Sequence, residues 1–165
     1  MPSPVIAIYP GTFDPITLGH QDLIRRGAGL FDTVVVAVAV AHHKKTLLDL
    51  DERLALVREV VRRYANVRVE NFSGLLVDFA KVQGAKVILR GVRSVTDLDF
   101  EAPLAGMNRA LAPELETVFL TPDSRYQHIS STLVREIARL QGDVSQFVAP
   151  PVLASLRAKA QTLST

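Results

Sequence analysis

The segment Thr33–Val40 is the feature that most restricts how this chain can fold. All of its residues are apolar or β-branched. β-Branched residues favour strands, because their stiff side chains pack well on a pleated surface. A strand without a polar face needs cover on both sides, which is the situation of strands in parallel sheets. We therefore expect a parallel sheet with helices on both of its faces.

Further short apolar runs alternate along the chain with stretches of helical periodicity. The other expected strands are Val5–Ile8, Val67–Val69, Lys86–Leu89 and Thr117–Leu120. The expected helices are Gln21–Leu30, a segment capped by Asp49 or Asp51, Leu75–Gln83, Val95–Leu111, a segment from Ser130 to Gly142, and one that follows Pro150-Pro151 and ends near Gln161. This alternation predicts an α/β fold, a doubly wound five-stranded parallel sheet with right-handed crossovers. Residues 1–165 are expected to form a single domain with a C-terminal helix.

Composition restricts the classes of function that remain. The chain has 48% apolar and 22% charged residues and no Cys, so disulfides and thiolate zinc sites are excluded. The start shows no charged segment followed by an apolar stretch, and the longest apolar runs are shorter than a membrane span. We therefore expect a cytoplasmic protein with no membrane partner. The net charge is +2 and the Arg pairs lie among acids, so no nucleic-acid partner is expected.

The segment Tyr9–His20 connects the first expected strand to the first expected helix. Gly11 has no side chain where the backbone turns, so main-chain N–H groups can approach a ligand, and Thr12 adds a hydroxyl. Thr17 is a suitable N-cap, which places His20 in the first helical turn. Such groups at a helix N-terminus form a site suited to a phosphate. A Gly/Pro turn with a surface His is the alternative explanation.

Three other loops follow expected strands and carry groups that bind phosphates. They contain Lys44, the pair Arg90 and Arg93, and the segment Ser130–Thr132. Ligands of open parallel sheets bind beyond the carboxyl ends of the strands, so these loops are expected to meet the Tyr9–His20 segment in one site. Neither arginine has an obvious carboxylate next to it, so a ligand phosphate is the expected counter-charge.

Less specific explanations remain open for some of these residues. Lys44 and Lys45 are also consistent with a solvated charge pair, and Ser130–Thr132 with a helix N-cap alone. His42 and His43 are expected to face solvent, because no carboxylate or Cys lies at the spacing of a metal site. No metal site made by the protein is therefore predicted.

The string Thr17-Leu18-Gly19-His20 resembles the Thr-x-x-His signature of the nucleotidyltransferases related to class I aminoacyl-tRNA synthetases. The longer string, Tyr-Pro-Gly-Thr-Phe-Asp-Pro-Ile-Thr-x-Gly-His from Tyr9 to His20, resembles the bacterial phosphopantetheine adenylyltransferase family. Further similar segments extend to about Leu156: Ile88–Arg93, Asp99–Glu101, Met107–Arg109, Glu114–Leu120, Ile129–Glu136 and Gly142–Val144. The resemblance implies a Rossmann-like nucleotidyltransferase fold.

The resemblance also implies roles for individual residues. Phosphopantetheine would be held by Thr12, Lys44, Leu76, Arg90 and Asn108. ATP would be held by Thr12, Phe13, His20, Gly91, Val92, Arg93, Glu101, Tyr126, Gln127, His128, Ile129, Ser130, Ser131 and Thr132. The catalytic residues would be His20, Lys44 and Arg93, with His20 stabilising the transition state.

The implied reaction is transfer of AMP from ATP to 4′-phosphopantetheine, which gives dephospho-coenzyme A and pyrophosphate. This is the penultimate step of coenzyme A synthesis. Mg²⁺ would enter with ATP and be held mainly by substrate and water, because the sequence shows no dedicated carboxylate cluster. A homohexamer and feedback inhibition by coenzyme A are further implications.

Two other functions fit the same motifs. One is a related nucleotidyltransferase that adenylylates nicotinamide mononucleotide or transfers CMP to a small alcohol phosphate, and it would differ near Leu76 and Asn108. The other is a non-enzymatic nucleotide-binding module on the same fold. The chain also departs from the family at Ala41–His43, where small residues and Pro are common. A further departure is Pro103, which is expected in the first turns of its helix or at a bend.

Overall fold

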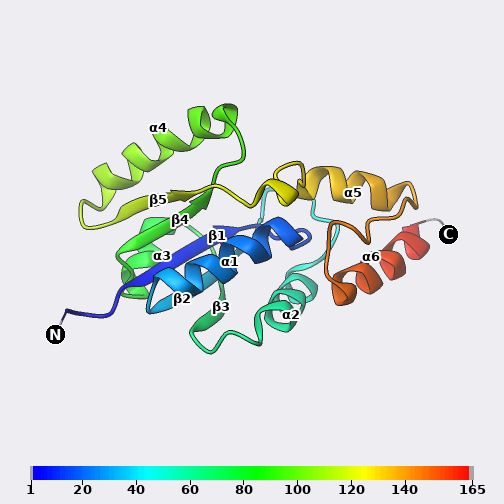
Figure 1. Cartoon of the computed structure of the whole chain (residues 1–165), viewed down its shortest axis with the longest axis horizontal. Helices are drawn as coiled ribbons and strands as arrows, with labels where there is room; N and C mark the ends of the chain where they lie inside the picture. The colour runs from blue at the N-terminus through cyan, green and yellow to red at the C-terminus, as the bar shows by residue number, and fades with distance from the viewer. Residues whose placement is uncertain (1, 164–165) are drawn as a thin grey trace.

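The structure, a computed structural model, describes residues 2–163. Its centre is one five-stranded parallel sheet in the order β3-β2-β1-β4-β5. The strands are β1 (Ile6–Gly11), β2 (Thr33–Ala39), β3 (Val67–Phe72), β4 (Val87–Gly91) and β5 (Glu116–Leu120). The helices are α1 (Leu18–Leu30), α2 (Leu50–Val61), α3 (Leu76–Val82), α4 (Val95–Leu111), α5 (Ser131–Arg139) and α6 (Pro150–Leu163), with a short 3-10 helix η1 (Ser124–Tyr126). The expected α/β sheet with a C-terminal helix is confirmed (Figure 1).

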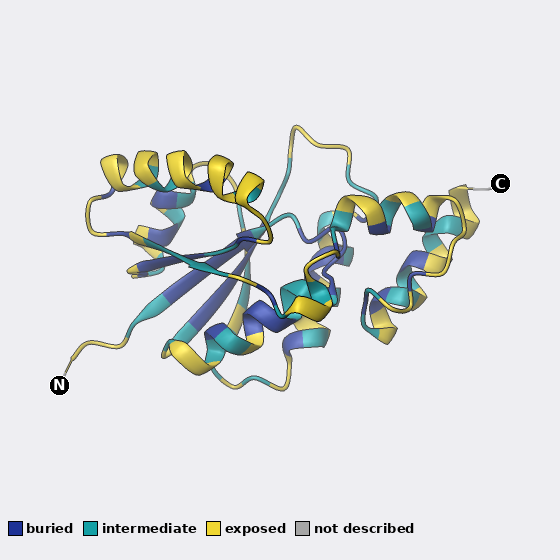
Figure 2. Cartoon of the chain, turned by 45° about the horizontal axis from the view of Figure 1, so that its top comes forward, coloured by how far each residue is buried: buried dark blue, intermediate teal, exposed yellow. Residues whose placement is uncertain are grey.

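The sheet carries an apolar layer on each face, because alternate residues of β2 point to opposite sides. Val34, Val36 and Val38 belong to the layer that contains α1 and α2, whereas Val35 and Ala37 belong to the layer that contains α3. All five side chains are fully buried, and Figure 2 shows the central strands as the buried part of the molecule. A strand covered on both faces has no place for polar side chains, which explains the run of β-branched residues.

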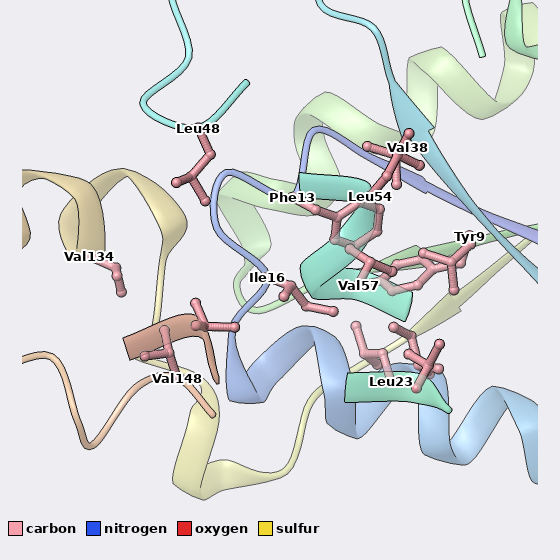
Figure 3. Packing of buried hydrophobic residues seen from close by; sticks show 14 of the residues in the cluster. Tyr9, Phe13, Ile16, Leu23, Val38, Leu48, Leu54, Val57, Val134 and Val148 are labelled. Carbon is pink, nitrogen blue, oxygen red and sulfur yellow. The ribbon is translucent and has the colours of Figure 1, made fainter. Parts of the chain in front are cut away.

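The larger apolar layer lies between the sheet and helices α1, α2, α5 and α6. Tyr9 and Val38 contribute from the strands, Leu23 from α1, Val57 from α2 and Val134 from α5 (Figure 3). Residues from both ends of the sequence therefore share one core. This layer joins the C-terminal helices to the first half of the chain.

Several element boundaries differ from the expectation. β4 continues to Gly91, so Arg90 lies within the strand and not in the loop after it, and β3 extends to Phe72. α6 begins at Pro150, so both prolines lie in its first turn, where no intrahelical N–H bond is lost. Pro103 occupies the ninth position of α4, past the first turns, and the helix continues through it.

The strand order reverses between β1 and β4, whose residues Ala7 and Ile8 pair with Val87 and Ile88. In an open parallel sheet, a crevice forms outside the carboxyl ends of the strands at this switch point. β1 leads into α1 and β4 leads into α4. The segments that follow these two strands therefore border the same crevice.

We expect Leu89→Ala to lower the free energy of unfolding by about 2–5 kcal/mol. Leu89 is fully buried in β4 and packs against Gly27 of α1, so its removal leaves a cavity that a glycine cannot fill. Urea unfolding measures the change. The matched control is Leu140→Ala, which should change stability by no more than about 0.5 kcal/mol, because Leu140 is 79% exposed. Equal losses in both variants would contradict this core.

Candidate active site

A cleft of about 890 Å³ lies at the carboxyl edge of the sheet. The last residues of four strands line it, namely Gly11, Ala39, Phe72 and Gly91, and Pro122 lines it from the segment after β5. The four loops whose residues are expected to bind phosphate all reach this cleft. The structure thus brings together segments that are more than a hundred residues apart in the sequence.

Most residues that the sequence nominates for ligand binding line this cleft. They are Thr12, His20, Lys44, Leu76, Arg90, Gly91, Arg93, Glu101, Tyr126, Ile129, Ser130, Ser131 and Thr132. The lining of the cleft contains three basic side chains, Lys44, Arg90 and Arg93, and two acidic ones, Glu101 and Asp97. The basic side chains outnumber the acidic ones, so the balance suits an anionic ligand.

Five nominated residues lie outside the cleft lining. They are Phe13, Val92, Asn108, Gln127 and His128. Phe13 and Val92 are buried, and the ring of Phe13 packs edge-on against His20 with centroids 5.0 Å apart. Gln127–His128 is exposed, and Asn108 lies in the last turn of α4. Phe13 is thus a buried residue that packs against the imidazole of His20.

Other residues line the cleft without having been nominated. They include Tyr9, Leu23, Phe72, Thr96, Asp97 and Phe100. Phe72 was missed because β3 was expected to end three residues earlier, before it reached the sheet edge. Asp97 lies in the first turn of α4, where the Ser94 side chain accepts from its N–H. That Ser N-cap is the sequence signal that could have placed this helix start at the cleft.

His20 has a fixed position and a fixed tautomer. It is the third residue of α1 and forms a capping box with Thr17, which confirms Thr17 as the N-cap. The Thr17 N–H donates to His20 Nδ1 at 3.0 Å. Because a backbone N–H can only donate, Nδ1 carries no proton, and the proton of the neutral ring is on Nε2. The Nε2–H group is therefore the donor that remains for a ligand.

The His20 ring is neutral near neutral pH. Burial lowers the pKa of His20 to about 4, and the positive charge of Arg93 acts in the same direction. The positive end of the α1 dipole also disfavours the cation. Tyr9 and Phe13 place their rings within 6.4 Å and 5.0 Å of the imidazole, which accounts for its desolvation. His20 thus offers a directional hydrogen bond and not a charge.

Arg90 has a carboxylate partner, contrary to the expectation from the sequence. Its Nε and Nη2 donate to Glu101 at 2.8 and 2.6 Å. Glu101 lies 11 residues further along the chain, in the second turn of α4, so the pair is not visible among neighbouring residues. Arg93 also has a carboxylate partner, contrary to the expectation, because its Nε lies 3.5 Å from Asp97 Oδ2. Its backbone N–H donates to Asp97 at 2.8 Å, and its Nη1 donates to the Ile129 carbonyl at 2.7 Å.

The start of α5 brings a second helix N-terminus to the cleft. The Ser130 side chain caps this helix by accepting from the Leu133 N–H at 3.1 Å. Ser131 Oγ donates to the Pro15 carbonyl at 2.9 Å, which holds α5 against the segment that carries Thr12. Amides in the first turn of a helix have no intrahelical acceptor, so those at the start of α5 suit an anion.

Known proteins are similar to this chain in sequence and in fold. The profile of the cytidylyltransferase-like family matches residues 8–137. A phosphopantetheine adenylyltransferase of Acidovorax sp. (strain JS42) is 62% identical over 148 residues, which cover 90% of this chain and 90% of that protein. This chain belongs to the phosphopantetheine adenylyltransferase family. Another member, from Bordetella avium (strain 197N), is 55% identical over 157 residues, which cover 95% of this chain and 94% of that protein.

Solved structures extend the similarity beyond the phosphopantetheine adenylyltransferase family. A bifunctional NMN adenylyltransferase/ADP ribose pyrophosphatase from Francisella tularensis aligns with a TM-score of 0.71 at 12% identity. The alignment covers 98% of this chain and 50% of that one. At this identity the similarity bears on the fold alone. The expected Rossmann-like nucleotidyltransferase fold is confirmed, as is the resemblance to the family.

We expect acid to weaken the fold partly through His20. The unfolded chain has an imidazole pKa near 6.5, whereas the folded value is about 4. Between these values the unfolded state binds more protons, so the free energy of unfolding falls as the pH is lowered. Urea unfolding near pH 7 and near pH 5 should show a smaller loss in His20→Gln than in the wild type. His42→Gln, which removes an exposed imidazole, is the control and should keep the wild-type loss. An unchanged loss in His20→Gln would rule out this contribution.

Proposed function

We propose that this chain transfers the adenylyl group of ATP to the 4′-phosphate of phosphopantetheine, releasing pyrophosphate and dephospho-coenzyme A. Family membership supports the choice of substrates. The observation that supports the chemistry is the content of one cleft, where the Nε2–H of His20 lies with Lys44, Arg90 and Arg93. Two polyanions that must approach each other need cations and fixed donors of this kind.

The proposed reaction needs no general base. The phosphate of the acceptor is already ionised, so one of its oxygens is a nucleophile. This oxygen attacks the α-phosphorus of ATP, a new P–O bond forms, and the bond to the bridging oxygen breaks as pyrophosphate leaves with its electron pair. Catalysis then consists of positioning and charge neutralisation.

His20 is proposed to donate from Nε2 to a non-bridging oxygen of the α-phosphate. The charge on that oxygen changes as the phosphorus becomes five-coordinate, so the hydrogen bond is stronger in the transition state than in the ground state. The ring is neutral and held by Thr17, so it adds direction without adding a permanent charge. Lys44 and Arg93 would neutralise the phosphates around it.

The two substrates would occupy different sides of the cleft. Leu76 at the start of α3 and Phe72 at the end of β3 provide an apolar side suited to the pantetheine chain. The segment Tyr126–Thr132 and the N-terminus of α5 would receive the outer phosphates of ATP. Gly91 at the end of β4 and Arg93 just after it would also contact ATP.

Mg²⁺ is proposed to bind together with ATP. In the described part of the chain, no group of three or more His, Asp or Glu side chains gathers to hold a metal ion. Mg²⁺ keeps several waters and binds phosphate oxygens readily, so the polyphosphate and water would supply its ligands. When bound, it would neutralise part of the polyphosphate charge.

Inhibition by coenzyme A and a cytoplasmic location are further parts of the proposal. Coenzyme A shares most of its atoms with the proposed product, so it would compete for the same cleft and inhibit the reaction. Across residues 2–163, none of the helices combines the length and the apolar character needed to span a bilayer. The cytoplasm remains the expected location.

Purified protein should release pyrophosphate and form dephospho-coenzyme A when it is given ATP, phosphopantetheine and Mg²⁺. Mass spectrometry of the products checks whether dephospho-coenzyme A is formed. Nicotinamide mononucleotide in place of phosphopantetheine is the control and should give no turnover. Turnover of nicotinamide mononucleotide alone would favour a related nucleotidyltransferase. Binding of ATP without any turnover would favour a non-enzymatic module.

His20→Ala should lower kcat about 10²–10³-fold, the range seen when one preorganised oxyanion donor is removed. The KM for ATP should change little, because the lost hydrogen bond is made mainly in the transition state. Steady-state kinetics measure both constants, and circular dichroism checks the fold. His42→Ala, at an exposed imidazole outside the cleft lining, is the control and should retain activity. A near-normal kcat in His20→Ala would assign this ring a structural role only.

The surface of α4 supports the proposal that the protein is a homo-oligomer, with a hexamer as the expected form. Glu101 is its one buried residue, and Figure 2 shows the helix as almost wholly exposed. Its exposed apolar side chains are Val95, Leu98, Phe100, Leu104, Met107 and Leu111. Apolar surface gathered on one element typically marks a protein interface.

Light scattering at micromolar concentration should give a mass several times that of one chain. Met107→Asp should reduce this mass, because it would place a charge in the apolar surface of α4, where Met107 is 64% exposed. Leu140→Asp is the control, since Leu140 is 79% exposed on a different element. A monomeric wild type would refute the proposed assembly.

A further inference from the structure

Arg90 and Glu101 form a two-pronged ion pair inside the cleft. The Nε of Arg90 donates to Oε2 of Glu101 at 2.8 Å, and Nη2 donates to Oε1 at 2.6 Å. The Glu101 side chain is 10% exposed, and that of Arg90 is 26% exposed. Two parallel hydrogen bonds of this kind fix the plane of the guanidinium as well as its position.

A third contact completes the orientation of Arg90. Its Nη1 lies 3.4 Å from the Pro10 carbonyl of β1 and donates to it. A guanidinium has five N–H groups, so these contacts leave two, one on each Nη. Because Arg90 lines the cleft, these two N–H groups are the ones that a ligand can use.

Two carboxylates line this cleft, Asp97 beside Arg93 and Glu101 beside Arg90, and Glu101 is the more deeply buried of the two, with its side chain 10% exposed against 30% for Asp97. Next to Lys44, Arg90 and Arg93, a carboxylate reduces the positive field and repels the phosphates that the proposed function requires. Glu101 is also the one buried residue of α4. The most deeply buried position of this helix is therefore occupied by a charged side chain. This placement is explained if the orientation of Arg90 matters more than its full charge.

We propose that Glu101 is a positioning residue for Arg90, and that it aims the two remaining N–H groups at the terminal phosphate of the acceptor. This inference rests on the proposed function. It differs from the role that the family resemblance implies for Glu101, which is contact with ATP. The two roles predict opposite effects on the two substrates, so kinetics can separate them.

Glu101→Gln is the sharpest test. The amide keeps the size of the side chain and one acceptor oxygen, but its NH₂ group opposes a donor of Arg90, so the guanidinium loses its fixed plane. The KM for phosphopantetheine should rise about 10-fold to 100-fold, the equivalent of one lost charge-assisted hydrogen bond. The KM for ATP should stay within about twofold. Glu101→Asp, which keeps the charge, should recover part of the loss.

The matched control is Glu116→Gln. Glu116 accepts from Arg109 at 2.8 Å in an exposed pair outside the cleft lining, so this variant removes the same charge without touching Arg90. It should keep the wild-type KM for both substrates. A rise in its KM for phosphopantetheine would show that the effect is general electrostatics, and would overturn the proposal.

A double-mutant cycle shows whether Glu101 acts through Arg90. In the Arg90→Ala background, Glu101→Gln should have no further effect on the KM for phosphopantetheine. A full additional loss in that background would overturn the positioning role. So would a rise in the KM for ATP alone, which would return Glu101 to ATP contact. A fall in the KM for phosphopantetheine would mean that the carboxylate merely competes with phosphate, and would also overturn it.

NMR covers the case in which Glu101→Gln does not fold. In the wild type, the Nε–H signal of Arg90, assigned by its loss in Arg90→Lys, should be protected from exchange and should shift on addition of phosphopantetheine but not of ATP. A signal that shifts with ATP alone, or one without protection, would overturn the proposal. Absence of turnover by the wild type would refute the proposed function, whereas wild-type turnover with an unchanged KM in Glu101→Gln would refute this inference alone.

Discussion

The buried guanidinium of Arg53 is the interaction on which the carboxyl edge of the sheet depends. It is 1% exposed and donates to the carbonyl oxygens of Thr12, Ala39, Val40 and Leu48. Strands that end side by side leave carbonyls without strand partners, and a buried carbonyl without a donor is costly. The N–H groups of the single Arg53 guanidinium donate to all four carbonyls. Burial lowers the pKa of Arg53, and the nearby carboxylates of Asp14 and Asp49 oppose this shift.

Asp14 complements Arg53 from the other side of the same loops. Its carboxylate accepts from the N–H groups of Leu47 and Leu48 at 2.8 and 2.9 Å, and its carbonyl accepts from Arg135 at 2.7 Å. The segment that carries Thr12 is thereby joined to the segment that precedes α2 and to α5. Backbone N–H groups in segments held in this way need no rearrangement when a ligand arrives, which is the physical basis of electrostatic preorganisation.

The fold and much of the cleft could be predicted from the sequence, because their signals are local. The β-branched run of β2, the Thr17 cap and the position of His20 each follow from neighbouring residues. The pairing of Arg90 with Glu101 could not be predicted, because it depends on how α4 returns over the sheet. Burial of Phe13 likewise follows from tertiary packing, since an aromatic residue in a loop expected to bind phosphate suggests ligand contact as readily as core.

The two sides of the cleft are held by interactions of different strength. On the side of α5, Ser131 donates to Pro15 and Arg93 donates to Ile129, so the loops and helix termini are bonded to one another. On the other side, the Lys44 side chain is exposed, and the Lys44 N–H donates to the Ala41 carbonyl within the same loop. Helix α3 on this side begins without a side-chain cap. Ordering an exposed lysine costs conformational entropy, which ligand binding must offset. If this side binds the acceptor, as proposed, the substrate would order it on binding. A guanidinium already aimed there would then reduce the free energy that the substrate must supply.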